Sequence, residues 1–420
     1  MNGTETGSAT LAELCDLISE QVHPADVPEA LYVGLEHVTP GRLRRSGGGI
    51  AADVQSHKYA FRRNDILYGK LRPYLDKAIL ADTDGVCTTE LLVLRAKPGV
   101  DPRFLACLVH DPDFVEHALT GVTGAHHPRT SWAHIAQFEC PRFSYEEQQA
   151  IAALLWRIQD LLKVCEDTLE VAQDLKRAAM RELFTRGLRG EPQKETEIGP
   201  VPESWRVVEL GSLCLPTDQV DLISEGDRVI HYIDVSSVSR ESLRVETTTE
   251  YLLKDAPGRA RKRVRSGDVI FATIRPTLLR AARIDEALDN QVCSTAFCVL
   301  RTADPEQLGK YVFYAVQRPE FLELLTRIET GASYPAVTDR QVKAQPIPLP
   351  PPDEQREIVA ILEAIDRKIA LHRDKRRVLE DLFKALLHKL MTGEIRVSDL
   401  DLSTLEHADE STSSAAEEAV

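Results

Sequence analysis

Two stretches of this chain concentrate side chains that could bind phosphate groups. Residues 42–77 hold nine Lys or Arg against three acids, and residues 254–283 hold nine against two. The whole chain is acidic, with a formal net charge of −15, so both basic stretches are local features. Lys and Arg neutralise phosphates and release counterions, which gives affinity for nucleic acid without sequence preference. The sequence therefore favours two nucleic-acid contact regions, the alternative being an ordinary solvated surface.

Groups that can read base edges accompany these basic residues. Each half has an Arg-Pro pair, Arg72-Pro73 or Arg275-Pro276, and a later Gly-containing loop, at 123–129 or 330–335. Arg, Ser, Thr and His on loops can bond to bases in the major groove. A Pro also ends a strand and holds the Arg before it extended, so turn formation is the alternative role for each pair. The candidate DNA-binding residues are Arg44, Arg45, Lys58, Lys70, Arg72, Tyr74, His126, His127, Arg129, Arg261, Lys262, Arg263, Arg275, Thr277, Ser333 and Tyr334.

Catalytic and cofactor signatures are missing from the sequence. It contains no G-x-G-x-x-G or G-x-x-x-x-G-K-[ST] motif to cradle a nucleotide, and no Asn/Asp-Pro-Pro-aromatic tetrapeptide of adenine methyltransferases. His126-His127 could ligate a metal, but the second half has Ser333-Tyr334 there, which are poor ligands, so loop contacts are favoured. We therefore expect a non-catalytic protein that holds no metal and no cofactor of its own.

The basic stretches and the loops occupy equivalent places in two copies of one plan. Between residues 358 and 390, apolar residues recur in steps of four and three, the spacing of a heptad seam on a long helix. The same register occurs 207 residues earlier, between residues 151 and 183, and Glu147-Gln148 falls on Glu354-Gln355. We infer an internal duplication in which a globular domain is followed by a long helix, twice.

Connectivity determines how these two helices pair. The first leaves domain one and delivers the chain to domain two, so a second helix with the same seam must run antiparallel to it. Three polar seam residues, Lys176, His372 and Arg376, would fix the register. The expected fold class is α+β, with two pseudo-symmetric globular domains separated by an antiparallel coiled coil of two long helices. The predicted segments are domain 1–145, helix 146–189, domain 190–352, helix 353–395 and an acidic, disordered tail 396–420.

Local patterns predict the smaller elements. Asp353 is the expected N-cap of the second long helix. Helical segments are expected over 9–19, 102–119 and 305–328, and strands over 31–35 and 231–235.

Bulk features suggest a cytoplasmic protein. The sequence has no run of 18 apolar residues and no N-terminal signal pattern, so we expect no membrane association. Its eight cysteines form no C-x-x-C pair, which predicts buried free thiols.

The combination of duplicated domains, Pro-rich entry and long helices resembles the specificity (S) subunits of type I restriction–modification systems. The resemblance covers roughly residues 9–400, and one departure is Cys140–Ser144, which stands where the second half has its Pro-rich run. The residues that carry the resemblance are 64–75 (Asn-Asp-Ile-Leu-Tyr-Gly-Lys-Leu-Arg-Pro-Tyr-Leu), 201–205 (Val-Pro-Glu-Ser-Trp), 267–270 (Gly-Asp-Val-Ile), 330–333 (Thr-Gly-Ala-Ser) and 347–355 (Ile-Pro-Leu-Pro-Pro-Pro-Asp-Glu-Gln).

This resemblance implies that each globular domain is a target recognition domain for double-stranded DNA. It implies two adenine-N6 methyltransferase (M) subunits on the long helices, with motor–nuclease (R) subunits joining that core. S-adenosylmethionine would belong to M, and ATP and magnesium to R. The implied role is to recognise a bipartite, asymmetric site and to position M and R on it. The half-sites should differ, because the domains differ at His126-His127 and Ser333-Tyr334.

Three other functions remain open at this point. One is the specificity component of a related methyltransferase that lacks a type I motor. Another is a coiled-coil scaffold that binds protein and no DNA. The third is a self-contained nuclease, since Asp353 with Asp366-x-Lys368 loosely matches a nuclease pattern, although such spacings are common by accident.

Overall fold

The computed structural model describes residues 7–124, 126–331 and 334–401, so most of the predicted tail lies outside the described residues. The chain forms two compact units. Unit 1 combines residues up to 167 with those from 374 onwards, and unit 2 is residues 168–373. The predicted domain boundaries stay a prediction, because the division between the units falls within the long helices.

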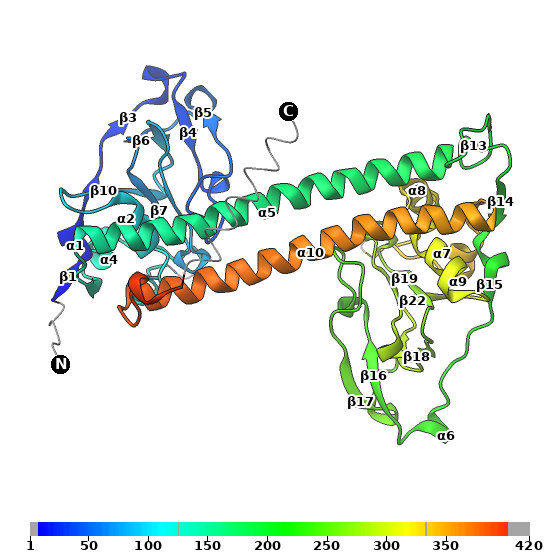
Figure 1. Ribbon diagram of the computed structural model, residues 1–420. Helices are drawn as coiled ribbons and strands as arrows, with labels where there is room; N and C mark the ends of the chain where they lie inside the picture. The colour runs from blue at the N-terminus through cyan, green and yellow to red at the C-terminus, as the bar shows by residue number, and fades with distance from the viewer. Residues whose placement is uncertain (1–6, 125, 332–333, 402–420) are drawn as a thin grey trace. The chain divides into compact units, whose positions relative to one another are not determined.

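Two long helices, α5 (Tyr145–Arg186, 42 residues) and α10 (Pro352–Met391, 40 residues), take part in both units (Figure 1). In unit 1, Leu155 of α5 shares a core with Leu387 of α10, so the first half of α5 meets the last part of α10. In unit 2, Phe184 packs with Ile358, which pairs the opposite ends. Within each unit the helices therefore run antiparallel, as the sequence predicted.

Three sheets build the globular part of unit 1. Their strand orders are β1-β11, β2-β10-β7-β8 and β3-β6-β9-β4-β5, and β4 pairs parallel with β9. The strands are β1 (Ser8–Thr10), β2 (Cys15–Ile18), β3 (Gln21–Val22), β4 (Leu31–Val33), β5 (Gly49–Ile50), β6 (Lys58–Phe61), β7 (Ile66–Gly69), β8 (Ala78–Leu80), β9 (Gly85–Cys87), β10 (Leu91–Ala96) and β11 (Glu139–Pro141).

Among its described residues, unit 2 repeats this topology except for a strand equivalent to β3, as expected of a duplication. Its sheets have the orders β14-β23, β15-β22-β19-β20 and β17-β16-β21-β18, with β16 parallel to β21, and β12 pairs with β13 before them. The strands are β12 (Gln193–Lys194), β13 (Val201–Pro202), β14 (Arg206–Glu209), β15 (Cys214–Leu215), β16 (Val229–Ile233), β17 (Thr249–Leu252), β18 (Ala260–Arg263), β19 (Val269–Ala272), β20 (Ala281–Arg283), β21 (Val292–Ser294), β22 (Phe297–Thr302) and β23 (Pro346–Leu349).

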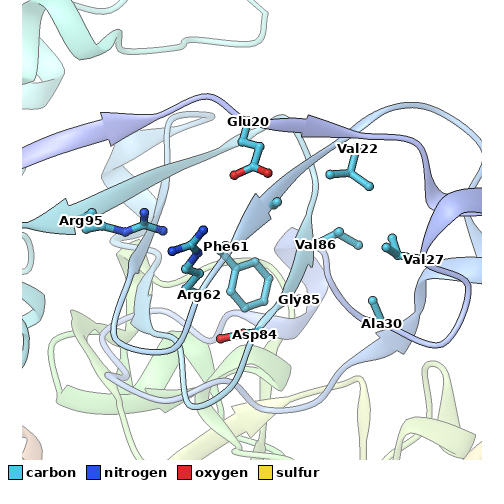
Figure 2. A pocket seen from close by; sticks show the side chains of 11 residues that line it. Glu20, Val22, Val27, Ala30, Phe61, Arg62, Asp84, Gly85, Val86 and Arg95 are labelled. Atoms are coloured by element: carbon cyan, nitrogen blue, oxygen red, sulfur yellow. The ribbon is translucent and has the colours of Figure 1, made fainter.

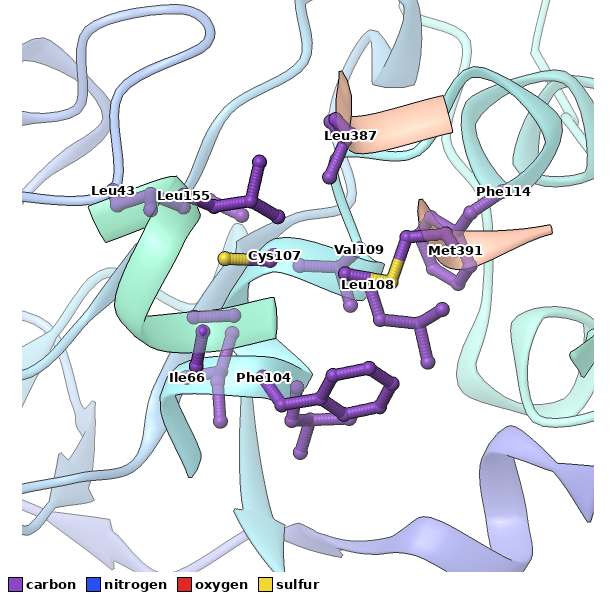
Figure 3. Close-up of a cluster of buried hydrophobic side chains, with 14 of the residues drawn as sticks. Leu43, Ile66, Phe104, Cys107, Leu108, Val109, Phe114, Leu155, Leu387 and Met391 are labelled. Atoms are coloured by element: carbon purple, nitrogen blue, oxygen red, sulfur yellow. The ribbon is translucent and has the colours of Figure 1, made fainter. Parts of the chain in front are cut away.

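Short helices cover the sheets and contribute to the cores. In unit 1, Phe104, Leu108 and Phe114 from two of these helices meet Leu155 and Leu387 of the long pair (Figure 3). The short helices are α1 (Leu11–Leu14), α2 (Pro102–Leu108), α3 (Pro112–Thr120), α4 (Trp132–Ile135), α6 (Leu222–Glu225), α7 (Lys310–Ala315), α8 (Pro319–Thr326) and α9 (Asp339–Lys343).

Several local predictions need correction. The segment 9–19 is helical for one turn only, because its second half, β2, pairs with β10. The segments 102–119 and 305–328 each contain a break, because Pro112 and Pro319 cannot continue a helix and instead start new ones.

The predicted N-cap of α10 is also wrong. That helix begins at Pro352, and the amide of Gln355 donates to the carbonyl of Pro351 at 3.0 Å. Asp353 therefore lies in the first turn, where its negative charge suits the helix dipole.

One other sequence prediction, that of free and mostly buried thiols, agrees with the structure. All eight cysteines are free, and seven of them are buried. Among the described residues, none of the helices is long and apolar enough to cross a membrane.

A buried carboxylate joins the two long helices in unit 2. Glu354, at the start of α10, is 2% exposed and accepts hydrogen bonds from the Leu188 amide (2.6 Å), just beyond α5, and from the Trp205 indole (2.9 Å). Its repeat counterpart Glu147 instead bonds to the Ser144 amide, in a capping box at the exposed start of α5. The same residue type thus has two different roles in the two copies.

We expect Glu354→Gln to lower the free energy of unfolding by about 1–3 kcal/mol, because one buried donor would then face the amide NH₂ of glutamine. Glu147→Gln is the matched control and should cost under about 0.5 kcal/mol, since Gln also completes a capping box. Urea unfolding of both variants measures the difference, and equal losses would contradict this account of Glu354.

Candidate nucleic-acid interface

The Arg-Pro pairs form the same unusual turn in both units. Arg72 has φ 52° and ψ 64°, and Arg275 has φ 49° and ψ 58°, both in the left-handed region. The expectation that Pro holds the preceding Arg extended is therefore wrong for both residues. A left-handed conformation costs a residue with a side chain of order 1–3 kcal/mol and persists only where surrounding contacts impose it.

Those contacts come from the Gly-containing loops. The Arg72 amide donates to the carbonyl of Pro128, and the Arg275 amide donates to the carbonyl of Pro335, each at 2.7 Å. The residue before each Arg also pairs with the loop, in the bridges Leu71–Arg129 and Ile274–Ala336. Each unit therefore brings together two segments that lie nearly 60 residues apart in the sequence and that the sequence analysis had identified separately.

Glycine makes these loops possible. Gly124 and Gly331 have φ values of 93° and 102°, which L side chains rarely adopt. A Cβ on Gly124 would lie 3.1 Å from the His127 carbonyl oxygen, and one on Gly331 would lie 2.8 Å from that of Tyr334. The chain can therefore fold back on itself here only without a side chain.

The turns and loops carry exposed polar and aromatic side chains in unit 1. Arg72 is exposed, and no hydrogen bond or ion pair joins its guanidinium to any described residue. Tyr74 is 53% exposed, and His126 and His127 are exposed on the neighbouring loop. Lys70 is half-buried just before the turn.

Unit 2 presents an equivalent surface that carries different side chains. The guanidinium of Arg275 stacks on the ring of Tyr334, 4.8 Å from its centroid, and this ring is 71% exposed. Thr277 is exposed on the turn, where unit 1 has Tyr74. Ser333 lies outside the described residues.

The remaining candidate residues bond within the protein. Five of them pair with acids, which compensate their charges, whereas Lys58 and Arg261 bond to uncharged oxygens. The contacts are Arg44 with Asp160 (2.8 Å), Arg45 with Asp82 (2.9 Å), Lys58 with Ser56 (2.7 Å), Arg129 with Glu90 (2.9 Å), Lys262 with Asp339 (2.5 Å), Arg263 with Glu225, and Arg261 with the Ala260 carbonyl (2.9 Å).

Two of these pairs show their strength in the pKa of the acid. Hydrogen bonding to Arg129 holds the pKa of the Glu90 carboxyl below its ordinary value, and Arg45 does the same for Asp82. Arg129 thus ties the loop to Glu90 at the end of the β9–β10 connection, which supports the turn from beneath. Arg129, a candidate DNA-binding residue, therefore makes its contact within the protein.

Sequence reasoning missed the residue that closes each turn. Asp76 and Leu279 cap the 3-10 helices Pro73–Leu75 and Pro276–Leu278, and both are left-handed, with φ values of 48° and 43°. No shared residue type marks this position, because one unit has an acid there and the other an aliphatic side chain. Only the repeat alignment could have suggested their equivalence.

A separate hollow of about 430 Å³ lies beside β6 and β9 in unit 1. Figure 2 shows the guanidinium groups of Arg62 and Arg95 near the Glu20 carboxylate, with Phe61 beside them. Arg95 is bonded to Asp65 at 2.7 Å. The two arginines are therefore balanced by acids, and the hollow lacks the net positive charge of a phosphate site.

One group of described residues has the donor types of a metal site. Oxygens of Asp111 and Asp113 and a ring nitrogen of His388 lie within 4.8 Å of one another. His388 Nδ1 lies 3.3 Å from Asp111, which is the N-cap residue of α3. An ion pair at a helix start accounts for this grouping.

Comparison with known proteins adds independent information on the family. Residues 202–381 match the model of the type I restriction modification DNA specificity domain. The MjaVIII specificity subunit of Methanocaldococcus jannaschii is 26% identical over 272 residues, covering 61% of this chain and 62% of that subunit. The putative MjaX specificity subunit of the same organism is 27% identical over 394 residues and 86% of each chain.

This chain is similar to type I restriction–modification specificity subunits, and its residues 202–381 match their DNA specificity domain. A solved type I S subunit from M. genitalium shares the fold, with a TM-score of 0.60, 15% identity, and coverage of 93% of this chain and 98% of that one. The resemblance first drawn from the motifs is confirmed, because the family model and both of these relatives are of the type I specificity kind.

Proposed function

We propose that this chain reads a bipartite, asymmetric site on double-stranded DNA and positions methyltransferase and motor–nuclease subunits there. The observation that carries the proposal is the matched pair of left-handed Arg turns, each held by a Gly-containing loop. Strain of this kind is retained where it serves a function. An exposed Arg at the tip of a rigid turn has the geometry to bond bidentately to guanine in the major groove.

The two turns support different half-sites. Unit 1 presents Arg72 with Tyr74 and the His126-His127 loop, whereas unit 2 presents Arg275 stacked on Tyr334. Stacking restricts the guanidinium and so lowers the entropy cost of a directional contact. The compensated residues, such as Arg44 and Arg45, contribute at most a diffuse positive field.

The long helices support a gap between the half-sites. At about 1.5 Å per residue, the uninterrupted 42-residue α5 is roughly 63 Å long. A protein that engages DNA through two domains joined by such helices would leave base pairs between them unread.

The helices also carry a repeated apolar stripe, which we propose as the binding surface for two methyltransferase subunits. On α5 its members are Val164, Val171 and Leu175, exposed by 52%, 68% and 55%. Their counterparts 207 residues later on α10 are Leu371, Val378 and Leu382, exposed by 66%, 60% and 37%. Single exposed apolar residues are ordinary, but a stripe present in both copies indicates a partner.

Glycine substitution separates the DNA contact from the fold. Arg72→Gly and Arg275→Gly relieve left-handed strain, so the free energy of unfolding should be unchanged or higher by up to about 1 kcal/mol. Each should nevertheless weaken binding of the assembled complex to its own half-site by about 1–3 kcal/mol, measured by fluorescence anisotropy.

Arg45→Ala is the matched control, because Arg45 is already bonded to Asp82, and it should leave discrimination between sites unchanged. If the glycine variants bound DNA like the wild type, these turns would not be the contact surfaces. Equal effects of both variants on both half-sites would contradict the assignment of one half-site to each turn.

Shortening both helices tests the gap. Removal of residues 165–171 from α5 and of the equivalent 372–378 from α10 shortens each helix by about 10 Å and keeps the heptad register. At about 3.4 Å per base pair, the tolerated gap should shrink by roughly three base pairs. Because the deletions also remove Val171 and Val378 of the apolar stripe described above, the gap is measured by binding of the variant chain to duplexes that differ in half-site spacing, without methylation. An unchanged preferred gap would mean that the helices do not set the spacing.

Charged substitutions test the apolar stripe. Val171→Glu and Val378→Glu are expected to lose one methyltransferase subunit each, and the double variant both, because a charge cannot be buried in an apolar contact without a large cost. Sedimentation of the mixed subunits measures the stoichiometry. Leu252→Glu, on the exposed strand β17, is the control and should leave two copies bound; a double variant with full stoichiometry would exclude this surface.

The other candidate functions predict different results. A scaffold that binds only protein would show no salt-dependent DNA binding. A methyltransferase component without a motor would give the same methylation pattern but no partner with helicase–nuclease domains, which the neighbouring genes would reveal.

A further inference from the structure

A buried histidine lies behind the Arg72 turn. The Nδ1 atom of His110 is 2.6 Å from a carboxylate oxygen of Asp76, the residue that closes the turn. Its Nε2 atom is 3.0 Å from the carbonyl oxygen of Ala78 in β8. The imidazole side chain is 1% exposed, whereas that of Asp76 is 30% exposed.

Both neighbours of this imidazole are hydrogen-bond acceptors. A neutral imidazole has one N–H donor, so it can satisfy only one of them, and the doubly protonated imidazolium satisfies both. The carboxylate of Asp76 lies 2.6 Å from the ring, and an acidic neighbour at this distance favours the protonated form of His110. The contact geometry therefore describes an imidazolium held between a carboxylate and a carbonyl.

Backbone hydrogen bonds also hold the turn, one at each end. The Arg72 amide bonds to Pro128, while the Asp76 carbonyl accepts from the Gly41 amide at 2.9 Å. Because Arg72 and Asp76 are both left-handed, the turn has two strained ends and needs a tie at each. His110 supplies the side-chain tie at the Asp76 end.

Unit 2 lacks this arrangement at equivalent positions. Leu279 closes its turn, and Gln317 stands two residues before the helix-starting Pro319, as His110 stands before Pro112. The Gln317 amide bonds to the Phe313 carbonyl and to Lys176, and so is directed elsewhere. The turn of unit 2, where Leu279 and Gln317 carry no charge, is therefore an internal control for the turn of unit 1.

We propose that His110 is a positioning residue for DNA recognition by the first domain only: as an imidazolium it holds Asp76, and through it the left-handed turn that presents Arg72. This rests on the proposed function of Arg72. Loss of one proton would leave either Asp76 or Ala78 without its donor and would loosen the turn. Recognition by the first domain should then weaken as the pH rises, while that by the second should not.

The groups around His110 favour its protonated form, in agreement with weaker recognition at high pH. Burial acts to lower the pKa of His110, but the charge and hydrogen bond of Asp76, with the Ala78 carbonyl, raise it overall above its ordinary value. A raised folded-state pKa means that the bond is present at low pH and is lost as the pH rises through that value.

Two other titratable groups lie near the pair. Tyr68 of β7 has a buried hydroxyl with no hydrogen-bond partner among the described residues. Burial and the Asp76 charge raise its pKa, so it stays neutral. Asp111 follows His110 in the chain, and burial raises its pKa to about 6, while His388 of α10 bonds to it. Asp111 titrates at the lower edge of the pH range of the test, so His388→Gln serves as the control for this neighbouring pair.

The first measurement is the protonation of His110 in the full chain, by NMR of ring-labelled histidine. The wild type should show both nitrogens protonated at neutral pH, and Asp76→Asn should move the titration midpoint to lower pH because the negative charge is gone. A neutral ring at about pH 6 in the wild type would overturn the proposal.

The second measurement is binding of the assembled complex to duplexes with one half-site intact, between about pH 6 and about pH 9. Wild-type affinity for the first half-site should fall by about two- to tenfold, as expected for one hydrogen bond. His110→Gln together with Asp76→Leu, which copies the second unit, should remove this pH dependence; His388→Gln should retain it. The second half-site should be bound equally at every pH by all variants.

The outcomes separate this proposal from the proposed function. Binding to both half-sites with the same pH profile in wild type and in the double variant overturns the role of His110 while DNA reading stands. Absence of specific binding to either half-site at any pH overturns DNA reading, and the role of His110 with it.

Discussion

The structure depends on the antiparallel packing of α5 against α10. Each globular domain uses the long helices to complete its core. Leu387 and Met391, far along the chain, fill the core of unit 1, and Phe184, just before the second domain, helps to fill that of unit 2. Arg42 strengthens this link in unit 1, since its guanidinium bonds to Glu166 of α5 and Glu380 of α10, each at 2.6 Å. A change in helix register would therefore disturb the domain cores as well as the spacer.

Such a rigid scaffold is suited to binding through side chains on short turns, without a whole helix or strand at the contact surface. The left-handed Arg72 and Arg275 are tolerable because strands, loops and short helices around them hold the backbone in place. A strained turn on a fixed scaffold presents its side chain with little freedom left to lose on binding. The proposed readers are thus few, while most basic residues near them stabilise the domains.

Because the chain is duplicated, equivalent residues in its two copies can be compared. Where the copies agree, as in the paired Arg turns and the exposed helical stripe, a shared task explains the agreement. Where they differ, local chemistry has diverged: Glu354 is buried and Glu147 caps a helix, and Asp76 with His110 stands where the second copy has Leu279 and Gln317. Such differences underlie the proposal that two similar domains read unlike half-sites.

The sequence by itself determined the duplication, the long helices and their antiparallel pairing, because heptad spacing and connectivity constrain these strongly. It also located both Arg-Pro turns and both loops, since Gly and Pro mark them. Only the tertiary structure showed that turn and loop lie together, that Arg72 and Arg275 are left-handed, and that Arg44, Arg45 and Lys262 are bonded to acids. Those features follow from contacts between residues distant in the chain, which override local preference and which no local pattern encodes.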